Sequence, residues 1–110
     1  MKIYAYKEQL GETPESWLRH AGYGMISDRR SGQLSFARRF TRDFYPRFHL
    51  YFQEALDAAG RPIIIFNLHL DQKRPGYEGF SRHNAEYDGE VVEREAARIS
   101  SLLRPDIFNR

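Results

Sequence analysis

Hydrophobic and polar residues alternate along several short stretches of the chain. In KIYAYK, residues 2–7, Ile3 and Ala5 alternate with two tyrosines. A period of two residues is typical of a β-strand that buries one face. This stretch therefore predicts a first strand with Ile3 and Ala5 facing the core.

The following segment, ETPESWLRHAG, carries the start and stop signals of a short helix. Thr13 is a good N-cap because its hydroxyl can accept a hydrogen bond from a free backbone N–H. Pro14 suits the first helical position, and Gly22 suits the position that follows the last turn. These signals predict a helix over residues 14–21.

Residues 23–40 predict a hairpin. The segment DRRSG supplies an aspartate that can bond its own backbone and a glycine that can adopt a positive φ. After this turn, Leu34, Phe36 and Phe40 fall on one strand face. Ser35, Ala37 and Arg39 fall on the other. Arg38 shares the apolar face, so we expect it near the rim of the core or at a bulge.

The second hairpin has the clearest pattern. Phe48, Leu50 and Phe52 alternate with Arg47, His49, Tyr51 and Gln53. Further along, Ile64, Phe66, Leu68 and Leu70 alternate with Ile63, Ile65, Asn67, His69 and Asp71. A three-residue loop, 58–60, with glycine in the left-handed position is a common connection between such strands. This loop pairs Asp57 with Arg61, so that Phe52 lies opposite Phe66 and Leu50 opposite Leu68 on the core face.

The same register predicts the pairs on the other face. It places Tyr51 opposite Asn67, His49 opposite His69 and Arg47 opposite Asp71. Residues 72–87 show no period and are interpreted as a long loop. A C-terminal helix follows, with Asp88 as its N-cap and Tyr87 stapled onto Val92. Its apolar positions, Val92, Ala96, Ile99 and Leu103, recur at helical spacing, and Pro105 ends it.

These elements predict an α+β fold with about five antiparallel strands, a short helix after the first strand and a C-terminal helix packed on the sheet. The 110 residues suffice for a single domain over 1–110. The chain has no cysteine, no run of 18 apolar residues and no signal-peptide pattern. We expect a cytoplasmic protein.

Charge is unevenly distributed along the chain. Residues 29–47 hold six arginines and one aspartate, whereas residues 86–95 hold five acids and one arginine. Such asymmetry can mark a surface that binds a partner. It can equally mean that a basic sheet face lies against an acidic helix within the fold.

The arginine-rich stretch suggests a surface for RNA or single-stranded nucleic acid. Arginine binds phosphates through paired N–H donors, and an exposed tyrosine can stack on bases. The candidate nucleic-acid-binding residues are Arg29, Arg30, Arg38, Arg39, Arg42, Arg47 and Tyr51.

A second hypothesis is a divalent-metal site made by His49, His69, Asp71 and His83. Two imidazoles and a carboxylate are a recognised ligand set for such ions. The alternative is a half-exposed histidine pair, with Asp71 bonded to Arg47. Acid–base catalysis by His69 and His83 without a metal is a further alternative.

The sequence thus leaves three function classes open. The first is a small binding module that takes nucleic acid or another anionic partner on an arginine-rich face. The second is a metal-dependent, hydrolase-type enzyme. The third is a structural or assembly subunit that pairs through a sheet edge.

Overall fold

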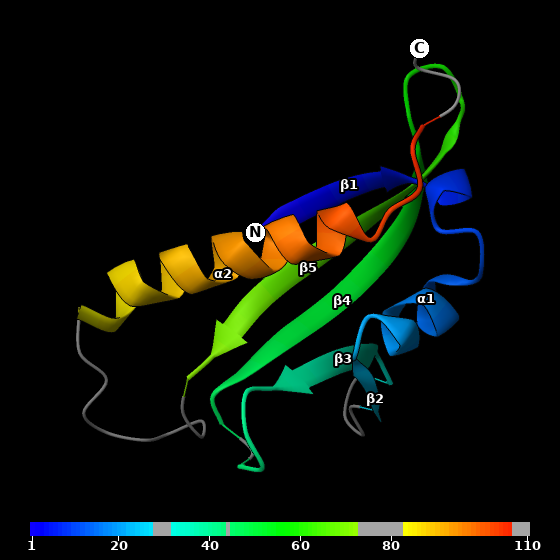
Figure 1. Cartoon of the computed structure of the whole chain (residues 1–110). Helices are drawn as coiled ribbons and strands as arrows, with labels where there is room; N and C mark the ends of the chain where they lie inside the picture. The colour runs from blue at the N-terminus through cyan, green and yellow to red at the C-terminus, as the bar shows by residue number, and fades with distance from the viewer. Residues whose placement is uncertain (28–31, 44, 73–82, 107–110) are drawn as a thin grey trace.

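The computed structural model of the 110-residue chain describes residues 1–27, 32–43, 45–72 and 83–106, with the backbone alone described for 83–88 (Figure 1). The elements are β1 (Lys2–Tyr6), the 3-10 turn η1 (Lys7–Gln9), α1 (Pro14–His20), β2 (Gly24–Ser27), β3 (Leu34–Arg39), β4 (Arg47–Leu56), β5 (Pro62–Asp71) and α2 (His83–Ser101). This order confirms the predicted α+β fold.

The strands form one antiparallel sheet of five strands in the order β1-β5-β4-β3-β2. From β2 to β5, each strand pairs with the next along the chain. The first strand, β1, pairs with the last strand, β5. β1 and β2 are therefore the two edges of the sheet.

The predicted register of the β4–β5 hairpin is confirmed at every pair. Phe52 lies opposite Phe66, and His49 lies opposite His69. The N–H of Asp57 donates to the carbonyl of Arg61 at 2.9 Å, and Gly60 has a φ of 82°. The three-residue loop therefore determines which side chains face the core along both long strands.

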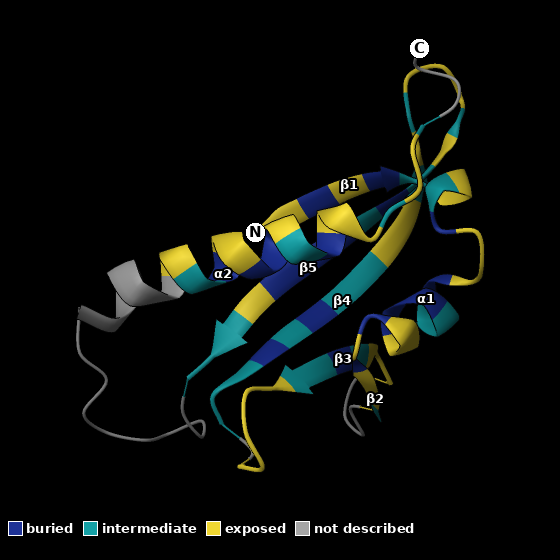
Figure 2. Ribbon diagram, in the orientation of Figure 1, coloured by how far each residue is buried: buried dark blue, intermediate teal, exposed yellow. Residues whose placement is uncertain are grey.

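Both helices pack on the same face of the sheet (Figure 1). The Trp17 ring of α1 stacks on Phe66 with 5.3 Å between the ring centroids, and Ile99 of α2 is fully buried. Buried positions alternate along β4, and the buried stripe of α2 faces the sheet (Figure 2). The described part of the chain places no helix or strand on the opposite face, which we call the open face.

The short helix α1 forms as its capping signals predict. The hydroxyl of Thr13 accepts a hydrogen bond from the N–H of Ser16 at 3.2 Å. Gly22 follows the helix with a φ of 100°, a conformation that other residues rarely adopt. The chain can therefore turn sharply into Tyr23 and β2.

The start of α2 differs from the sequence-based expectation. The helix begins at His83, so Asp88 lies inside it and the prediction of Asp88 as the N-cap is wrong. The sequence predicts a loop over residues 83–87 because they lack an apolar period. Most residue types differ in helix propensity by at most about 0.7 kcal/mol, so a polar turn can extend a helix that is anchored further along. The proposed contact of Tyr87 with Val92 lies outside the described side chains.

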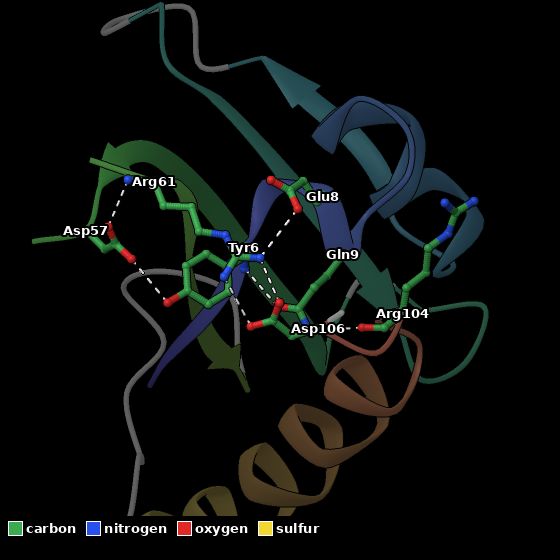
Figure 3. A network of polar contacts seen from close by, with 7 residues as sticks. All are labelled: Tyr6, Glu8, Gln9, Asp57, Arg61, Arg104 and Asp106. Atoms are coloured by element: carbon green, nitrogen blue, oxygen red, sulfur yellow. Dashed lines mark hydrogen bonds and ion pairs between the residues drawn. The ribbon is translucent and has the colours of Figure 1, made fainter. Parts of the chain in front are cut away.

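A polar network fastens the segment after α2 to the end of the sheet (Figure 3). The guanidinium of Arg61 lies 3.5 Å from the centre of the Tyr6 ring and donates to Asp106 at 2.7 Å. The phenol of Tyr6 donates to Asp57 at 3.1 Å. These groups satisfy one another, so we assign the network a structural role. No helix among the described residues has the length and apolar content to cross a membrane.

Candidate functional site

Paired polar and aromatic side chains cover the middle of the open face. In this part of the face, the cross-strand pairs of β4 and β5 are Arg47 with Asp71, His49 with His69 and Tyr51 with Asn67. Lys2 of β1 extends the last row, because it lies opposite Asn67 on the other side of β5. The sequence predicted all three pairs from the alternation and the loop length.

The row that contains Arg47 continues onto β3. Arg39 lies directly opposite Arg47, so two like charges are neighbours across the strands. Such a pair is destabilising by itself. Asp71, on the other side of Arg47, offsets it: the Nε of Arg47 donates to Asp71 Oδ2 at 3.3 Å. The described row still carries a net positive charge.

Aromatic rings lie beside this charged row. The rings of Tyr51 and His69 are stacked, with centroids 5.7 Å apart and an angle of 23° between their planes. The guanidinium of Arg47 lies 4.8 Å from the centre of the Tyr45 ring. Further along the face, Tyr4 is 61% exposed. The open face therefore offers both flat rings and cations to a partner.

His69 is held toward its neutral form. Partial burial, the ammonium group of Met1 and the neighbouring His49 lower the pKa of His69 below its ordinary value of 6.5, and Asp71 acts in the opposite direction. The Met1 ammonium lies close because it donates to the carbonyl of Leu68 at 2.9 Å. At neutral pH the His69 ring is therefore an uncharged surface that can stack on a planar group.

The histidines and Asp71 share one face as the metal hypothesis requires, but they do not converge. His49 Nδ1 lies 3.9 Å from Asp71 Oδ2, and the centroids of the two imidazoles are 6.5 Å apart. Within the described residues, no group of three or more His, Asp or Glu has the geometry of a metal site. The side chain of His83 lies outside that part of the chain, so the four-residue site stays a prediction.

The predicted arginine surface is divided between the two faces of the sheet. Arg39 and Arg47 belong to the open face, and Arg42 is exposed in the loop between β3 and β4. Arg38 lies on the helix-bearing face, where its Nη1 is 3.4 Å from Glu95 Oε1. Arg38 therefore pairs with an acid of α2 within the fold, as the intramolecular explanation of the uneven charge predicts. Arg29 and Arg30 lie outside the described residues.

The sequence-based interpretation missed a buried polar cluster around Glu95. This residue is only 4% exposed. Its carboxylate accepts from the phenol of Tyr23 at 2.6 Å and from two nitrogens of Arg98 at 2.7 and 2.8 Å. Burial and the hydrogen bond to Glu95 raise the pKa of Tyr23 above its ordinary value of 10. Glu95 lies in the apolar stripe of α2, between Val92 and Ile99. A carboxylate at such a position is expected to be buried and bonded, so the helical spacing could have revealed the cluster.

Comparison with known proteins gives no relative. No family model, no curated protein and no solved structure matches this chain.

Proposed function

We propose that this protein binds single-stranded nucleic acid on the open face of its sheet. The observation that carries the proposal is the stacked pair of Tyr51 and His69 on the face that both helices leave uncovered. Stacking on aromatic side chains contributes about 1–3 kcal/mol per base and tolerates any base, since every base has a flat π-face. An antiparallel sheet with surface aromatics is a recurrent way to hold unpaired bases.

The charges of the open face favour an anionic partner. The side-chain cations in these rows are Lys2, Arg39 and Arg47, and Asp71 is the carboxylate beside them. An arginine has five N–H donors, so the bond from Arg47 to Asp71 is compatible with a phosphate contact through other nitrogens. A strand whose bases stack on Tyr51 and His69 can thus place its phosphates toward the Arg39–Arg47 row.

Protonation of His69 couples binding to pH. A bound polyanion favours the charged imidazolium, so binding raises the pKa of His69 from its lowered value. By linkage, affinity increases as the pH falls through the pKa of His69 in the complex, and it levels off below the pKa of His69 in the free protein. At pH 7.5 the aromatic stacking and the permanent cations supply the affinity.

The direct test is the affinity of a labelled, mixed-sequence RNA single strand, measured by fluorescence anisotropy. Tyr51→Ala should weaken binding by about 1–3 kcal/mol because it removes a stacking ring. Met25→Ala is the matched control: Met25 is exposed and pairs with Phe36 on the helix-bearing face. Equal losses for the two variants, or no loss for Tyr51→Ala, would contradict the proposal.

A second candidate function is a metal-dependent enzyme. It is favoured by the placement of His49, His69 and Asp71 on one face, with His49 Nδ1 3.9 Å from Asp71. Zinc holds imidazole nitrogens at about 2.0–2.1 Å, so the two rings must turn toward a shared ion. Titration with Zn²⁺ should then shift the NMR resonances of both imidazoles together, and His69→Ala should abolish these shifts. Shifts at only one histidine would remove this candidate.

A further inference from the structure

A cavity of about 400 Å³ opens on the helix-bearing side of the sheet, between α2 and the adjoining ends of β3 and β4. It is lined by Arg38, Arg39, Phe40, Phe48, Val91, Arg94, Glu95 and Arg98. Its volume lies within the range of about 300–1,000 Å³ that is common for small-molecule sites. The cavity is therefore large enough for a small organic molecule.

The apolar part of the lining is formed by two phenylalanines and a valine. The rings of Phe40 and Phe48 are in contact, with centroids 4.7 Å apart. Phe48 is buried, but Phe40 is 38% exposed, and Val91 is only partly buried against the core. This apolar surface can be removed from water by the body of a ligand, at about 25 cal/mol per Å².

The carboxylate of Glu95 is already engaged. One of its oxygens accepts from Tyr23, and Arg98 donates to both oxygens while it also donates to the carbonyl of Ala21 at 2.8 Å. The contact between Arg38 and Glu95 is longer, at 3.4 Å. Glu95 therefore positions Arg98 and Arg38 but neutralises only one of them.

The lining carries excess positive charge. Even without Arg39, whose strand position belongs to the open face, three arginines stand against one carboxylate, a difference of +2 among the lining residues. Arg94 is exposed on α2 next to Glu95, and it forms no ion pair within the described part of the chain. Because like charges raise the energy of a partly enclosed site, a bound anion stabilises this arrangement.

We infer that this cavity binds a small organic anion. The carboxylate or phosphate of the ligand pairs with Arg38 and Arg94, and its apolar body lies against Phe40, Phe48 and Val91. Guanidinium groups suit both kinds of oxyanion because their paired N–H donors match two oxygens at once. Arg39, at the end of β3, borders both the cavity and the open face. The residues that hold the ligand, Arg38 and Arg94, belong to the helix-bearing side of the sheet.

Probes that separate charge from apolar surface test this inference. Phenyl phosphate and benzoate should saturate the site, with chemical-shift changes at the Val91 methyls and the Arg94 Nε–H. Inorganic phosphate, which lacks the apolar body, should bind at least about tenfold more weakly, and so should the neutral benzyl alcohol. Whichever of the two aromatic anions binds more tightly identifies the preferred headgroup.

Variants locate the site. Arg94→Gln should weaken phenyl phosphate about tenfold through the loss of a charge-assisted contact. Because Arg94 is exposed, the variant should keep its fold. Arg19→Gln, on the exposed side of α1, should leave the affinity unchanged. Oligonucleotide affinity should also stay within about twofold in Arg94→Gln, since Arg94 lies on α2, on the opposite side of the sheet from the open face.

Three results would overturn the inference. They are the absence of saturation by either aromatic anion at about 10 mM, equal affinity for inorganic and phenyl phosphate, and equal weakening by Arg94→Gln and Arg19→Gln. Each would mean that the cavity attracts anions only through general surface charge, or not at all.

Discussion

Tyr51 stacks on His69 as its diagonal neighbour across β4 and β5. Tyr51 lies opposite Asn67 in the ladder, and His69 is the next residue of β5 on the same face. Diagonal neighbours of this kind are within reach of aromatic side chains. The stacked pair therefore depends on the register that the loop at residues 58–60 imposes, and a slip of one residue would move His69 to the core face.

Phe66 is expected to be a main contributor to the stability of the core. It is fully buried and stacks on Trp17, so Phe66→Ala should lower the free energy of unfolding by about 3–5 kcal/mol. Tyr4→Ala, on a neighbouring strand, should cost less than about 1 kcal/mol because Tyr4 is exposed. Urea denaturation of both variants measures the difference. A small loss for Phe66→Ala would contradict the packing of α1 on the sheet.

The Glu95 carboxylate should contribute stability that acid removes. Burial raises its pKa, but the hydrogen bonds from Arg98 and Tyr23 outweigh this effect, so the pKa lies below the ordinary value of 4.5. The stabilisation is therefore fully present above pH 4.5 and is lost as the pH falls through the lowered pKa. At pH 7, Glu95→Gln should cost about 2–3 kcal/mol through weaker bonds to the arginine groups.

Glu93→Gln is the matched control for Glu95, because Glu93 is exposed on the same helix. It should change the stability at pH 7 by at most about 0.5 kcal/mol. Melting curves recorded between pH 7 and pH 3 should show a shallower loss of stability for Glu95→Gln than for the unaltered protein. Parallel curves would show that Glu95 is not a bonded carboxylate in the fold.

The pKa of His69 in the folded protein should lie below the pKa of a histidine in the denatured chain. The folded pKa of His69 lies below the ordinary value of 6.5, so neutral His69 is favoured in the folded state. The stability that neutral His69 contributes to the fold is therefore present above pH 6.5 and is lost as the pH falls through the folded pKa. NMR titration of the imidazole resonances measures this pKa directly. A value of 6.5 or above in the free protein would contradict the description of His69 as a neutral stacking surface.

Asp71 distinguishes the two candidate functions of the open face. If the face binds nucleic acid, Asp71→Asn should strengthen binding about two- to fivefold, because it removes the carboxylate next to Arg47. If the face binds a metal, the same substitution should remove a ligand and weaken binding of Zn²⁺. Anisotropy and metal titration on one preparation compare both effects. A variant that changes neither would favour a structural role for Asp71.

The sequence predicted the sheet better than the helix start and the buried charges. Alternation and the glycine of the 58–60 loop determine strand and register locally, so His49 could be placed opposite His69 without a structure. The start of α2 at His83 has no such local signal, since helix formation there is cooperative with the packed turns that follow. The position of Glu95 in the apolar stripe of α2 indicates that it is buried, but its partner Tyr23 lies 72 positions away, and no pattern within either segment specifies that partner.

Nucleic-acid binding on the open face is tested most directly by the salt dependence of affinity for a single strand. Each phosphate neutralised by a cation changes the slope of log K against log salt by about −0.7, so contacts from Lys2, Arg39 and Arg47 give about −2. Arg47→Gln should reduce the slope to about −1.4, whereas Arg19→Gln on α1 should leave it unchanged. A slope near zero, or a dissociation constant weaker than about 1 mM at both 50 and 200 mM salt, would contradict the proposed function.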